Sequence, residues 1–461
     1  MKKIFTSAAL MSIFYMNLNA QTINLDTSFG NGGIASFPLT GEADDLKISL
    51  STDHKILAYG KDIAASGTTN PNRIYKLNLD GSLNTGFGNG GILTLPNYVS
   101  DFNVLTQGND KILVTFQKTS NDSSSEISIL RYDLNGILDT GFGNNGEFKI
   151  PFNGTNGFRY QNTVVLPDHS ILLATGAQFI KLSSNGSIDT SYGANGSINQ
   201  PNSGNIQLSN SHILAFYDTK IDKISTTATP VSTFGTNGTF TYPDSGSYYS
   251  KQASDNSIHT LDLDGNSFYK INSAGSTSSL MSLTDDSNTL DFYSNFDITG
   301  NKLYFVGTAS TDKPFIVSYD TSGSLIPLNA QNSYKETALA QGNYTSVLAK
   351  DNVIYVGGDK KDLSTNTWYY VVAKYNVSAS SLSVNEVHSE NSISFENPAG
   401  SNLVYTTKEK IRKIELYSAD GKLLKTITEN NFNISDLTKG VYFLKTELDH
   451  GTIITKKLIK N

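Results

Sequence analysis

The sequence predicts an all-β protein whose main part is a seven-bladed β-propeller, and three observations support this prediction. A Gly-rich unit recurs along the chain. A second landmark, an Asx-Gly turn, recurs every 42 to 56 residues, close to the roughly 40 to 50 residues of a propeller blade. The composition, with 24 Tyr and 23 Phe in 461 residues and only 17% charged residues, favours pleated strands around a large core.

The two landmarks define seven units. The Gly-rich unit has copies at Leu25–Gly33, Leu83–Gly91, Leu138–Gly146, Ile188–Gly196 and Ser232–Gly238. The turn has copies at Lys76–Gly81, Arg131–Gly136, Lys181–Gly186, Lys223–Ala228, Lys270–Gly275, Ser318–Gly323 and Lys374–Ala379. Seven copies at blade-like spacing predict seven blades.

Each unit contains four short runs with strand character. In the first unit they are Leu46–Ser51, Lys55–Gly60, Arg73–Leu79 and Gly91–Leu95, separated by turn residues. Runs of β-branched and aromatic residues between such turns are typical of antiparallel strands. Four strands per unit predict one four-stranded blade.

The order of strands predicts how the ring closes. A lone strand at 33–37 precedes the first full unit, and the last unit, 345–376, lacks a fourth strand. If the N-terminal strand completes the last blade, two unpaired edges are removed. We therefore expect a propeller over residues 21–380 that is closed by its N-terminal strand.

The Gly-rich unit has a structural explanation. Asn, Asp and Gly supply the positive φ of tight turns, and we expect the aromatic residues of the unit to wedge between neighbouring blades. These are Phe29, Phe87, Phe142, Tyr192 and Phe234. The spacing G-x-G-x-x-G at 86–91 is followed by a strand-like run and a proline, not by the helix that a dinucleotide site requires. No nucleotide site is predicted.

Residues 77–91 and 132–146 resemble the delta-60 type repeat of secreted bacterial proteins, whose pattern runs Leu-Asn-x-Asp-Gly-x-Leu-Asp-x-x-Phe-Gly-x-x-Gly. Clear copies cover about residues 24–240. The resemblance implies a propeller-like array and no particular activity.

Residues 1–20 have the parts of a secretory signal peptide. Two lysines precede an apolar run, Ile4–Met16, and cleavage after Ala20 would leave Gln21 as the first residue. Thirteen apolar residues are fewer than the roughly 20 of a spanning helix, so no transmembrane segment is predicted. The sequence has 0 Cys and a net charge of −7, which excludes a disulfide framework and makes nucleic acid an unfavourable partner.

The C-terminal part, residues 391–461, follows a Ser-rich linker at 381–390 and predicts a small β-sandwich of seven short strands. It resembles the type IX secretion C-terminal sorting domain (type A) at Asn397, Pro398, Gly421, Lys422, Gly440, Tyr442, Lys457 and Lys460. The resemblance implies passage across the outer membrane by the type IX machinery, and then cleavage or surface attachment. An ordinary adhesive sandwich is the alternative.

Strand alternation places the second-to-third loops and the links between blades on one variable, loop-rich face. Long second-to-third loops are predicted at 61–72, 118–126, 308–314 and 359–367. Aromatic and basic residues near these loops are candidates for stacking on sugars or for binding a protein. They are Tyr98, Phe158, Arg159, Tyr160, Tyr248, Tyr249, Trp368 and Tyr369. The alternative is that they are partly buried strand ends, since tyrosine is common on β surfaces.

No catalytic residue, cofactor or metal site is predicted. His54 and His169 occupy the same turn in different blades, which separates them, and residues 262–266 form an Asp-Gly turn without the later acidic ligand of a calcium loop. The leading hypothesis is a secreted or surface-attached propeller that binds carbohydrate or protein. A polysaccharide-active enzyme with acidic residues at the channel mouth is the alternative, and a purely structural surface-layer component is a third possibility.

Overall fold

The chain divides into two compact units, Met1–Ser380 and Ser381–Asn461. The predicted signal peptide and linker lie outside the residues that the computed structural model describes. Among the described residues, no helix is long and apolar enough to cross a membrane, and all regular elements are strands. The described residues are 21–63, 72–95, 99–108, 110–118, 124–153, 160–199, 205–209, 211–243, 246–263, 267–283, 290–309, 313–326, 328, 334–336, 339, 342–379, 393–407, 410–419, 421–427, 429–449 and 453–461.

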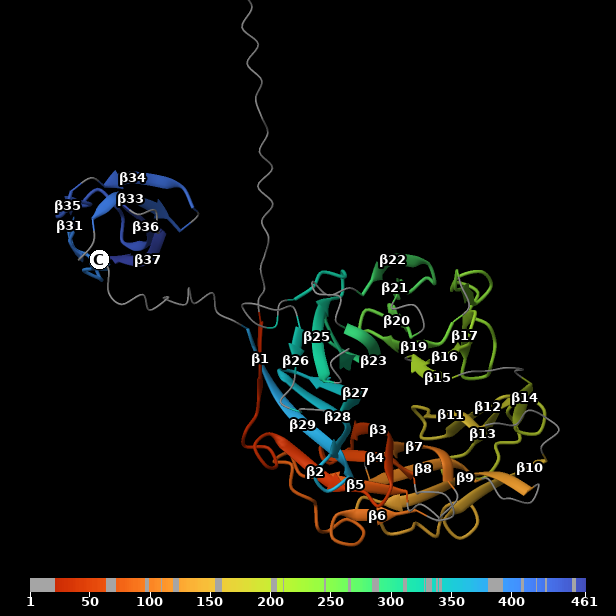
Figure 1. The fold of residues 1–461 in the computed structure, drawn as a ribbon. Coiled ribbons are helices and arrows are strands. Elements are labelled where there is room, and N and C mark those ends of the chain that lie inside the picture. The colour runs from red at the N-terminus through yellow and green to blue at the C-terminus, as the bar shows by residue number, and fades with distance from the viewer. Residues whose placement is uncertain are drawn as a thin grey trace, which may run out of the picture. The chain divides into compact units, whose positions relative to one another are not determined.

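Six sheets of the first unit each consist of four antiparallel strands in chain order (Figure 1). The first three are β3 (Glu42–Leu50), β4 (Ile56–Ile63), β5 (Arg73–Leu77) and β6 (Ile92–Thr94); β7 (Val99–Gln107), β8 (Lys111–Lys118), β9 (Ser124–Asp133) and β10 (Glu147–Asn153); and β11 (Tyr160–Val165), β12 (Ile171–Thr175), β13 (Gln178–Leu182) and β14 (Ser197–Asn199). The next three are β15 (Ile206–Ser209), β16 (His212–Phe216), β17 (Lys220–Ser225) and β18 (Thr239–Thr241); β19 (Tyr248–Gln252), β20 (Ile258–Asp262), β21 (Ser267–Ile271) and β22 (Thr277–Ser282); and β23 (Leu290–Thr299), β24 (Lys302–Ala309), β25 (Pro314–Asp320) and β26 (Tyr334–Glu336).

The seventh sheet joins the two ends of the first unit. It contains β27 (Asn343–Lys350), β28 (Val353–Asp362) and β29 (Thr367–Ala379), and the strands β1 (Gln21–Leu25) and β2 (Ile34–Pro38) both pair with β29. Gln21 lies opposite Ala379, and Ile34 lies opposite Ala373. The lone N-terminal strand of the sequence is therefore β2. No sheet among the described residues closes on itself.

One loop prediction was wrong. The sequence predicted a long loop at 359–367, but β28 continues to Asp362 and pairs with β29 from Thr367, with Lys361 opposite Trp368. The residues at the end of this hairpin are polar enough to resemble a loop in the sequence. In the structure, their pairing with β29 makes them part of the strand.

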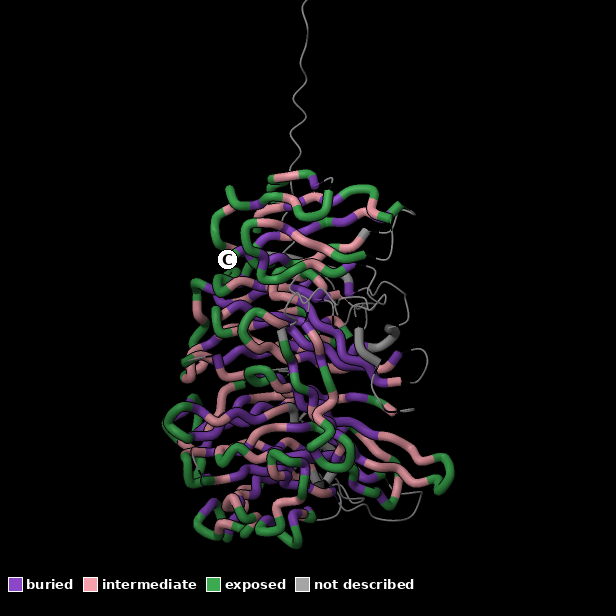
Figure 2. Tube along the Cα trace, turned by 90° about the vertical axis from the view of Figure 1, so that its left-hand side faces the viewer, coloured by how far each residue is buried: buried purple, intermediate pink, exposed green. Residues whose placement is uncertain are grey.

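The sheets follow one another around a common centre, with the first strand of each sheet nearest to it (Figure 1). The second strands are the most deeply buried, and β12 is buried at all five positions. A strand covered by other sheets on both faces reads as a continuous apolar run instead of an alternating one. Buried residues accordingly run along the strands while exposed residues gather at the turns (Figure 2).

The two landmarks of the repeat contact one another across the boundary between sheets. Phe142, which is 0% exposed, belongs to the turn after β9, and the N–H of Gly143 donates to the carbonyl of Asn185 in the next sheet at 2.8 Å. Gly186 has φ +83°, and a Cβ there would lie 2.7 Å from the Phe142 ring. The same contact recurs between Phe87 and Gly136. The aromatic wedges therefore explain why the following turn ends in glycine.

Asp359 is a buried carboxylate on β28. It is 4% exposed and accepts a hydrogen bond from the side-chain amide of Asn343 at 3.2 Å. Burial raises the pKa of Asp359 to about 6, and the neighbouring Asp45 and Asp44 add to the effect. Near neutral pH, the folded protein therefore carries the Asp359 carboxylate in a buried site where its ionised form is unfavourable.

Replacing this charge should stabilise the protein at alkaline pH. The folded-state pKa lies above the ordinary value of 3.8, so the cost of the carboxylate is full above about pH 6 and disappears as the pH falls toward 4. Asp359→Asn keeps the acceptor oxygen and is expected to raise the free energy of unfolding by up to about 3 kcal/mol at pH 8, but not at pH 4. Urea titrations at both pH values measure this, with the exposed turn variant Asp351→Asn as control. An equal gain for Asp359→Asn at both pH values would contradict the assignment.

The second unit is a small all-β domain. Its main sheet has the order β34 (Leu423–Ile427), β33 (Ile411–Ser418), β36 (Gly440–Leu448) and β37 (Ile453–Lys460). Two short pairs accompany it: β30 (Ile393–Phe395) with β32 (Tyr405–Thr407), and β31 (Asn402–Leu403) with β35 (Phe432–Asn433). Ile414, Leu416, Leu444 and Leu458 of the main sheet are almost fully buried in its core.

Candidate functional site

A pocket of about 630 Å³ lies where the first strands of the sheets converge. Every sheet of the first unit contributes at least one lining residue, and these include Lys47, Asn103, Asn162, Gln207, Tyr249, Asn295 and Ser346. We call this the central pocket. Its size falls within the roughly 300 to 1,000 Å³ of small-molecule sites.

Amide side chains form a connected series along the central pocket. The hydroxyl of Tyr59 donates to Asn103 Oδ1 at 2.8 Å, and Asn103 Nδ2 donates to Asn162 Oδ1 at 2.9 Å. Asn162 Nδ2 then donates to the carbonyl of Ile206 at 3.0 Å, and Gln207 Nε2 donates to the carbonyl of Ser250. Each contact joins one sheet to the next. An amide nitrogen carries two hydrogens, so each amide retains donor capacity for a ligand.

Similar contacts continue through the remaining sheets. Lys251 Nζ lies 2.7 Å from Asp297 Oδ1, and Asp297 Oδ2 accepts from the N–H of Ala349 at 2.7 Å. Thr345 Oγ1 donates to the carbonyl of Leu46 at 2.8 Å, which returns the series to the β3–β6 sheet. These polar contacts link each of the seven sheets to its neighbour.

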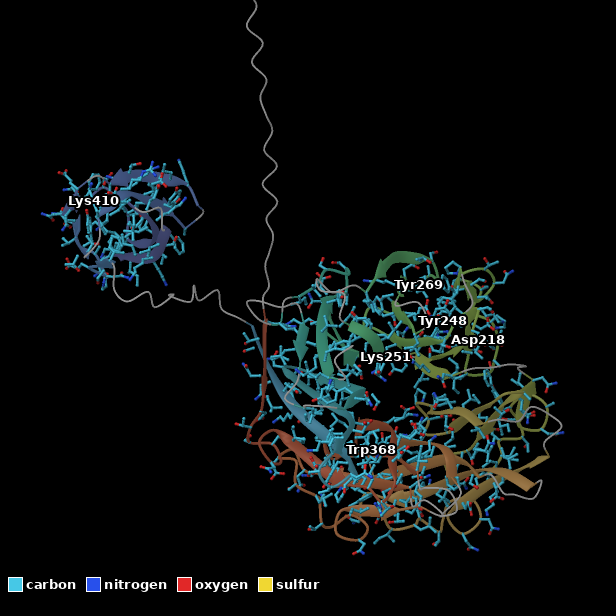
Figure 3. All side chains as sticks on the ribbon, in the orientation of Figure 1. Asp218, Tyr248, Lys251, Tyr269, Trp368 and Lys410 are labelled. Atoms are coloured by element: carbon cyan, nitrogen blue, oxygen red, sulfur yellow. The ribbon has the colours of Figure 1, made fainter. Side chains whose placement is uncertain are left out.

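Two half-buried tyrosines line the central pocket. Tyr248 stacks on Tyr242 with ring centroids 3.9 Å apart, and Tyr249 meets Phe296 edge-on at 5.5 Å. Figure 3 labels Tyr248 and, closer to the centre of the unit, Lys251 on the same strand β19. Packing behind each ring limits its rotation, so the exposed parts are preorganised for contact with a ligand.

The charges at the central pocket balance. Among the described residues that line it, Asp45 and Lys47 carry opposite charges. Deeper along β19, burial disfavours the Lys251 ammonium, but Tyr249 and Asp297 outweigh this effect, so the pKa of Lys251 lies well above its usual range. Lys251 therefore keeps its charge beside Asp297. The pocket suits a neutral polar ligand better than an ionic one.

One polar atom at the central pocket is left without a partner. Asn295 Oδ1 is buried and accepts no hydrogen bond in the described structure. An unsatisfied buried carbonyl costs about 1–3 kcal/mol. Because less than 1 Å² of this oxygen is accessible, a ligand in the pocket does not reach it.

The structure separates the binding residues that the sequence predicted. Tyr248 and Tyr249 line the central pocket. Trp368 lines a smaller hollow with Lys361 Nζ 5.4 Å from its ring, and Tyr369 lines a groove between the β3–β6 sheet and the sheet that contains β29. Tyr160 begins β11 opposite Thr175. Tyr98, Phe158 and Arg159 lie outside the described residues.

The amides of the central pocket were not predicted from the sequence. Asn205 precedes β15 and Asn162 is the third residue of β11, whereas Asn103 and Asn295 lie in the middle of β7 and β23. Asparagine is also common in turns, so its presence on or just before a first strand is a weak signal. Which of them face the centre depends on strand register, which the sequence leaves open.

The groove between the β3–β6 sheet and the β29 sheet is larger, about 1,070 Å³. Much of its lining consists of residues that pack the two sheets together, and Phe37 stacks on Tyr75 there at 4.5 Å. None of the described residues that line it has a buried side-chain polar atom without a hydrogen-bond partner. In the described part of the chain, no group of three or more His, Asp or Glu residues is placed to hold a metal ion.

Two of the residues that the sequence predicted as a sorting motif hold strands of the second unit in place. Asn397 Nδ2 donates to the carbonyl of Lys457 at 3.0 Å, and its Oδ1 accepts from the N–H of Ile459 at 2.8 Å. Its amide thus acts as a short extension of the sheet beside β37. Tyr442 is buried and donates to the carbonyl of Thr438 at 2.7 Å.

The other motif residues shape turns and strand ends. Gly421 has φ +82° in the turn that precedes Lys422, and the N–H of Lys422 donates to Ser418 Oγ at 3.2 Å. Gly440 begins β36 opposite Lys460. Pro398 follows Asn397 through a cis peptide bond.

Comparisons with known proteins found similar solved structures and a family model that matches the C-terminal part. Several solved structures resemble the chain at low sequence identity. A virginiamycin B lyase from Staphylococcus aureus is 13% identical, with 73% of this chain and 98% of that chain covered and a TM-score of 0.44. YCF48 from Cyanidioschyzon merolae is 12% identical, with 74% and 98% covered and a TM-score of 0.42. The WD40 β-propeller domain of Doa1 is 12% identical, with 74% and 97% covered and a TM-score of 0.32.

The first unit is an all-β structure by its own strands, and a β-propeller domain is among the solved structures to which the chain is similar. Residues 395–461 match the secretion system C-terminal sorting domain. This domain implies export by the type IX machinery and a secreted or cell-surface location, as its motifs predicted. None of the curated proteins matches the chain.

Proposed function

We propose that the protein is a secreted or cell-surface binding propeller that takes carbohydrate in the central pocket. In this proposal residues 1–20 are a signal peptide that is removed, and residues 21–380 form seven blades of delta-60-like repeats closed where β1 and β2 pair with β29. Residues 381–390 are a linker, and residues 391–461 are the sorting domain. The observation that carries the binding role is the neutral pocket lined by amides and two half-buried tyrosines.

The chemistry of this lining favours sugars over proteins. Sugar hydroxyls both donate and accept, which matches side-chain amides, and the apolar face of a sugar ring packs against an aromatic ring. A recessed pocket also suits a slender ligand better than a folded protein surface. A protein ligand would instead engage the exposed loops around the pocket.

Substitutions in the central pocket are expected to weaken glycan binding. Purified residues 21–461 should be retained saturably on at least one member of a panel of neutral polysaccharides, without release of product. Tyr249→Ala and Asn205→Ala should each lower affinity about tenfold, because a stacking contact or a hydrogen bond contributes about 1–1.5 kcal/mol. Affinity electrophoresis and calorimetry measure this, with thermal unfolding as the check on folding.

Trp368→Ala distinguishes the central pocket from the hollow that Trp368 lines. If glycan binds in the central pocket, the glycan affinity of Trp368→Ala should be unchanged. Loss of binding in Trp368→Ala together with full binding in Tyr249→Ala would place the ligand at the border between two sheets, and retention on no glycan would contradict the carbohydrate assignment.

A polysaccharide-active enzyme is the second candidate. It is favoured by Asp359, whose raised pKa suits a general acid, and by its interaction with Asp45, which lines the central pocket. Asp359 itself is not among the lining residues of the pocket, so binding remains the first proposal. Released oligosaccharide that disappears in Asp45→Asn would support the enzyme.

A further inference from the structure

Part of the outer face of the main sheet in the second unit is apolar. When one face of an antiparallel sheet packs on a core, the side chains on its other face are ordinarily polar. On β36, Val441 and Phe443 alternate with the buried Tyr442 and Leu444, so they point away from the core. Val441 is 39% exposed, and Ile459, which lies opposite it on β37, is also 39% exposed.

The apolar side chains form one continuous patch across all four strands of the main sheet. Tyr417 of β33 lies opposite Phe443 of β36 and opposite Leu423 of β34, which is 46% exposed. Phe443 and Val441 are two residues apart on the same face of β36. We call Leu423, Tyr417, Phe443, Val441 and Ile459 the outer patch. Contiguous exposed apolar side chains mark interaction surfaces, whereas scattered ones do not.

The other part of the same face carries the polar side chains that a solvated sheet requires. Glu415 lies opposite both Lys445 and Thr426, and Lys445 also lies opposite Thr455. Glu415 additionally forms an ion pair with Lys413. The contrast within one sheet shows that the outer patch does not reflect a generally apolar surface of this domain.

A lysine borders the outer patch. Lys457 of β37 lies opposite Phe443 and is two residues from Ile459 on the same face. None of the ion pairs described in this unit includes Lys457. An apolar surface with an unpaired ammonium at its border is complementary to a protein surface that is apolar with carboxylates at its margin.

The family match indicates what kind of partner this domain has. Residues 395–461, which include the whole outer patch, match the secretion system C-terminal sorting domain, and this domain implies recognition by the type IX machinery. Asn397 and Tyr442 are already occupied by hydrogen bonds within the domain. A recognition surface therefore requires other, exposed side chains, and the outer patch supplies them.

The size of the outer patch favours a transient contact. Its five side chains are far fewer than the roughly 20–30 residues that each partner contributes to a stable interface. A small apolar contact suits a chain that the secretion machinery must bind and then release better than it suits a permanent dimer.

We propose that the outer patch is the surface by which a protein component of the type IX machinery recognises this chain. The partner surface is apolar with an acidic margin that meets Lys457. Asn397 and Tyr442 then act indirectly, because they hold the strands in the arrangement that assembles the patch. This inference concerns export and is independent of what the central pocket binds.

The test changes the outer patch while the net charge stays constant. Val441→Glu with Ile459→Lys places opposite charges directly across two strands, a pairing that stabilises sheets. Thr426→Lys with Thr455→Glu is the matched control, because it also adds one charge of each sign, but on the polar part of the same face. Full chains 1–461 are produced in a bacterium that has type IX secretion. Immunoblotting then measures the fraction of the chain that is in the medium or accessible to protease on the cell surface.

The patch variant should lower the exported fraction about tenfold, since central residues of an interface dominate its affinity. The control should be exported like the unmodified chain. Unchanged export of the patch variant, or an equal loss in the control, would overturn the inference. Thermal unfolding of the purified chains checks folding, and Leu423→Glu on β34 repeats the test if the double variant unfolds at a lower temperature.

A second copy of the chain is the competing occupant of the outer patch. Sedimentation velocity of residues 21–461 tests this, and a monomer is expected. A dimer that the patch variant dissociates would assign the patch to self-association and overturn the inference.

Discussion

A chain that lacks residues 21–38 is expected to lose the cooperative unfolding transition of its first unit. These residues supply both strands that pair with β29, and they bury Ile23, Phe29 and Phe37 at 1%, 0% and 7% exposure. Each side chain contributes about 1.5–3 kcal/mol. The sum of about 5–9 kcal/mol approaches the roughly 5–15 kcal/mol net stability of a typical domain.

Deletion of residues 21–38 also removes the polar contacts of Gln21. Its side chain is 2% exposed, donates to Ser318 Oγ at 2.8 Å and accepts from Lys302 Nζ at 2.9 Å. These contacts tie the first strand to the β23–β26 sheet as well as to β29. Deletion would leave buried polar groups of that sheet without partners.

The experiment compares residues 21–461 with residues 39–461 by circular dichroism and differential scanning calorimetry. The shorter chain should show no native transition, or one more than 15 °C lower, since about 1 kcal/mol corresponds to about 2–4 °C in a domain of 150–250 residues. A synthetic peptide of residues 21–38 added in trans should restore part of the transition. Identical melting of the two chains would contradict closure by the N-terminal strands.

Phe142→Ala is expected to lower the free energy of unfolding by about 3–5 kcal/mol. The ring is 0% exposed and lies between the turn that carries it and Gly186 of the next sheet, with the Arg131 guanidinium 4.7 Å from its centroid. Truncation leaves a cavity at a contact between two sheets, and neither backbone turn is free to move into it. Urea titration monitored by fluorescence and circular dichroism measures the change.

Ile137→Ala is the matched control, because it removes a similar apolar side chain from the neighbouring turn, where Ile137 is 65% exposed. It should cost less than about 0.5 kcal/mol. If Phe142→Ala were no more destabilising than this control, the aromatic residues of the repeat would not be wedges between blades.

Much of the fold was predictable because local sequence and tertiary contacts agree in this chain. The run Lys55–Gly60 was predicted as a strand and falls on β4, whose first five positions are buried. Phe29, Phe87, Phe142 and Phe234 were predicted as wedges and are at most 1% exposed. Seven short strands were predicted for residues 391–461, and the described part of this domain contains eight, β30 to β37. The fine placement of the hairpin at 359–367 was wrong, since pairing with β29 overrode its polar composition.

The candidate site was predicted only in small part. Tyr248 and Tyr249 were predicted as binding residues because they lie near the loops of the variable face, and they line the central pocket. Trp368 and Tyr369 were chosen for the same reason, yet they lie at the border of two sheets. An aromatic residue at a strand end looks the same in the sequence whether it faces the centre or a neighbouring sheet.

The sequence alone determined the class of structure and the destination of the protein. Recurrent turns such as 131–136 and 181–186 encode repeated antiparallel sheets through local backbone preferences, and residues 395–461 carry the sorting domain as a contiguous segment. Tertiary structure decided what the centre can bind. Asn103, Asn162, Gln207, Tyr249 and Asn295 are far apart in the chain, and they converge only because seven sheets place their first strands around one point. Local propensity acts over a few residues, whereas a binding pocket is built from contacts across the whole unit.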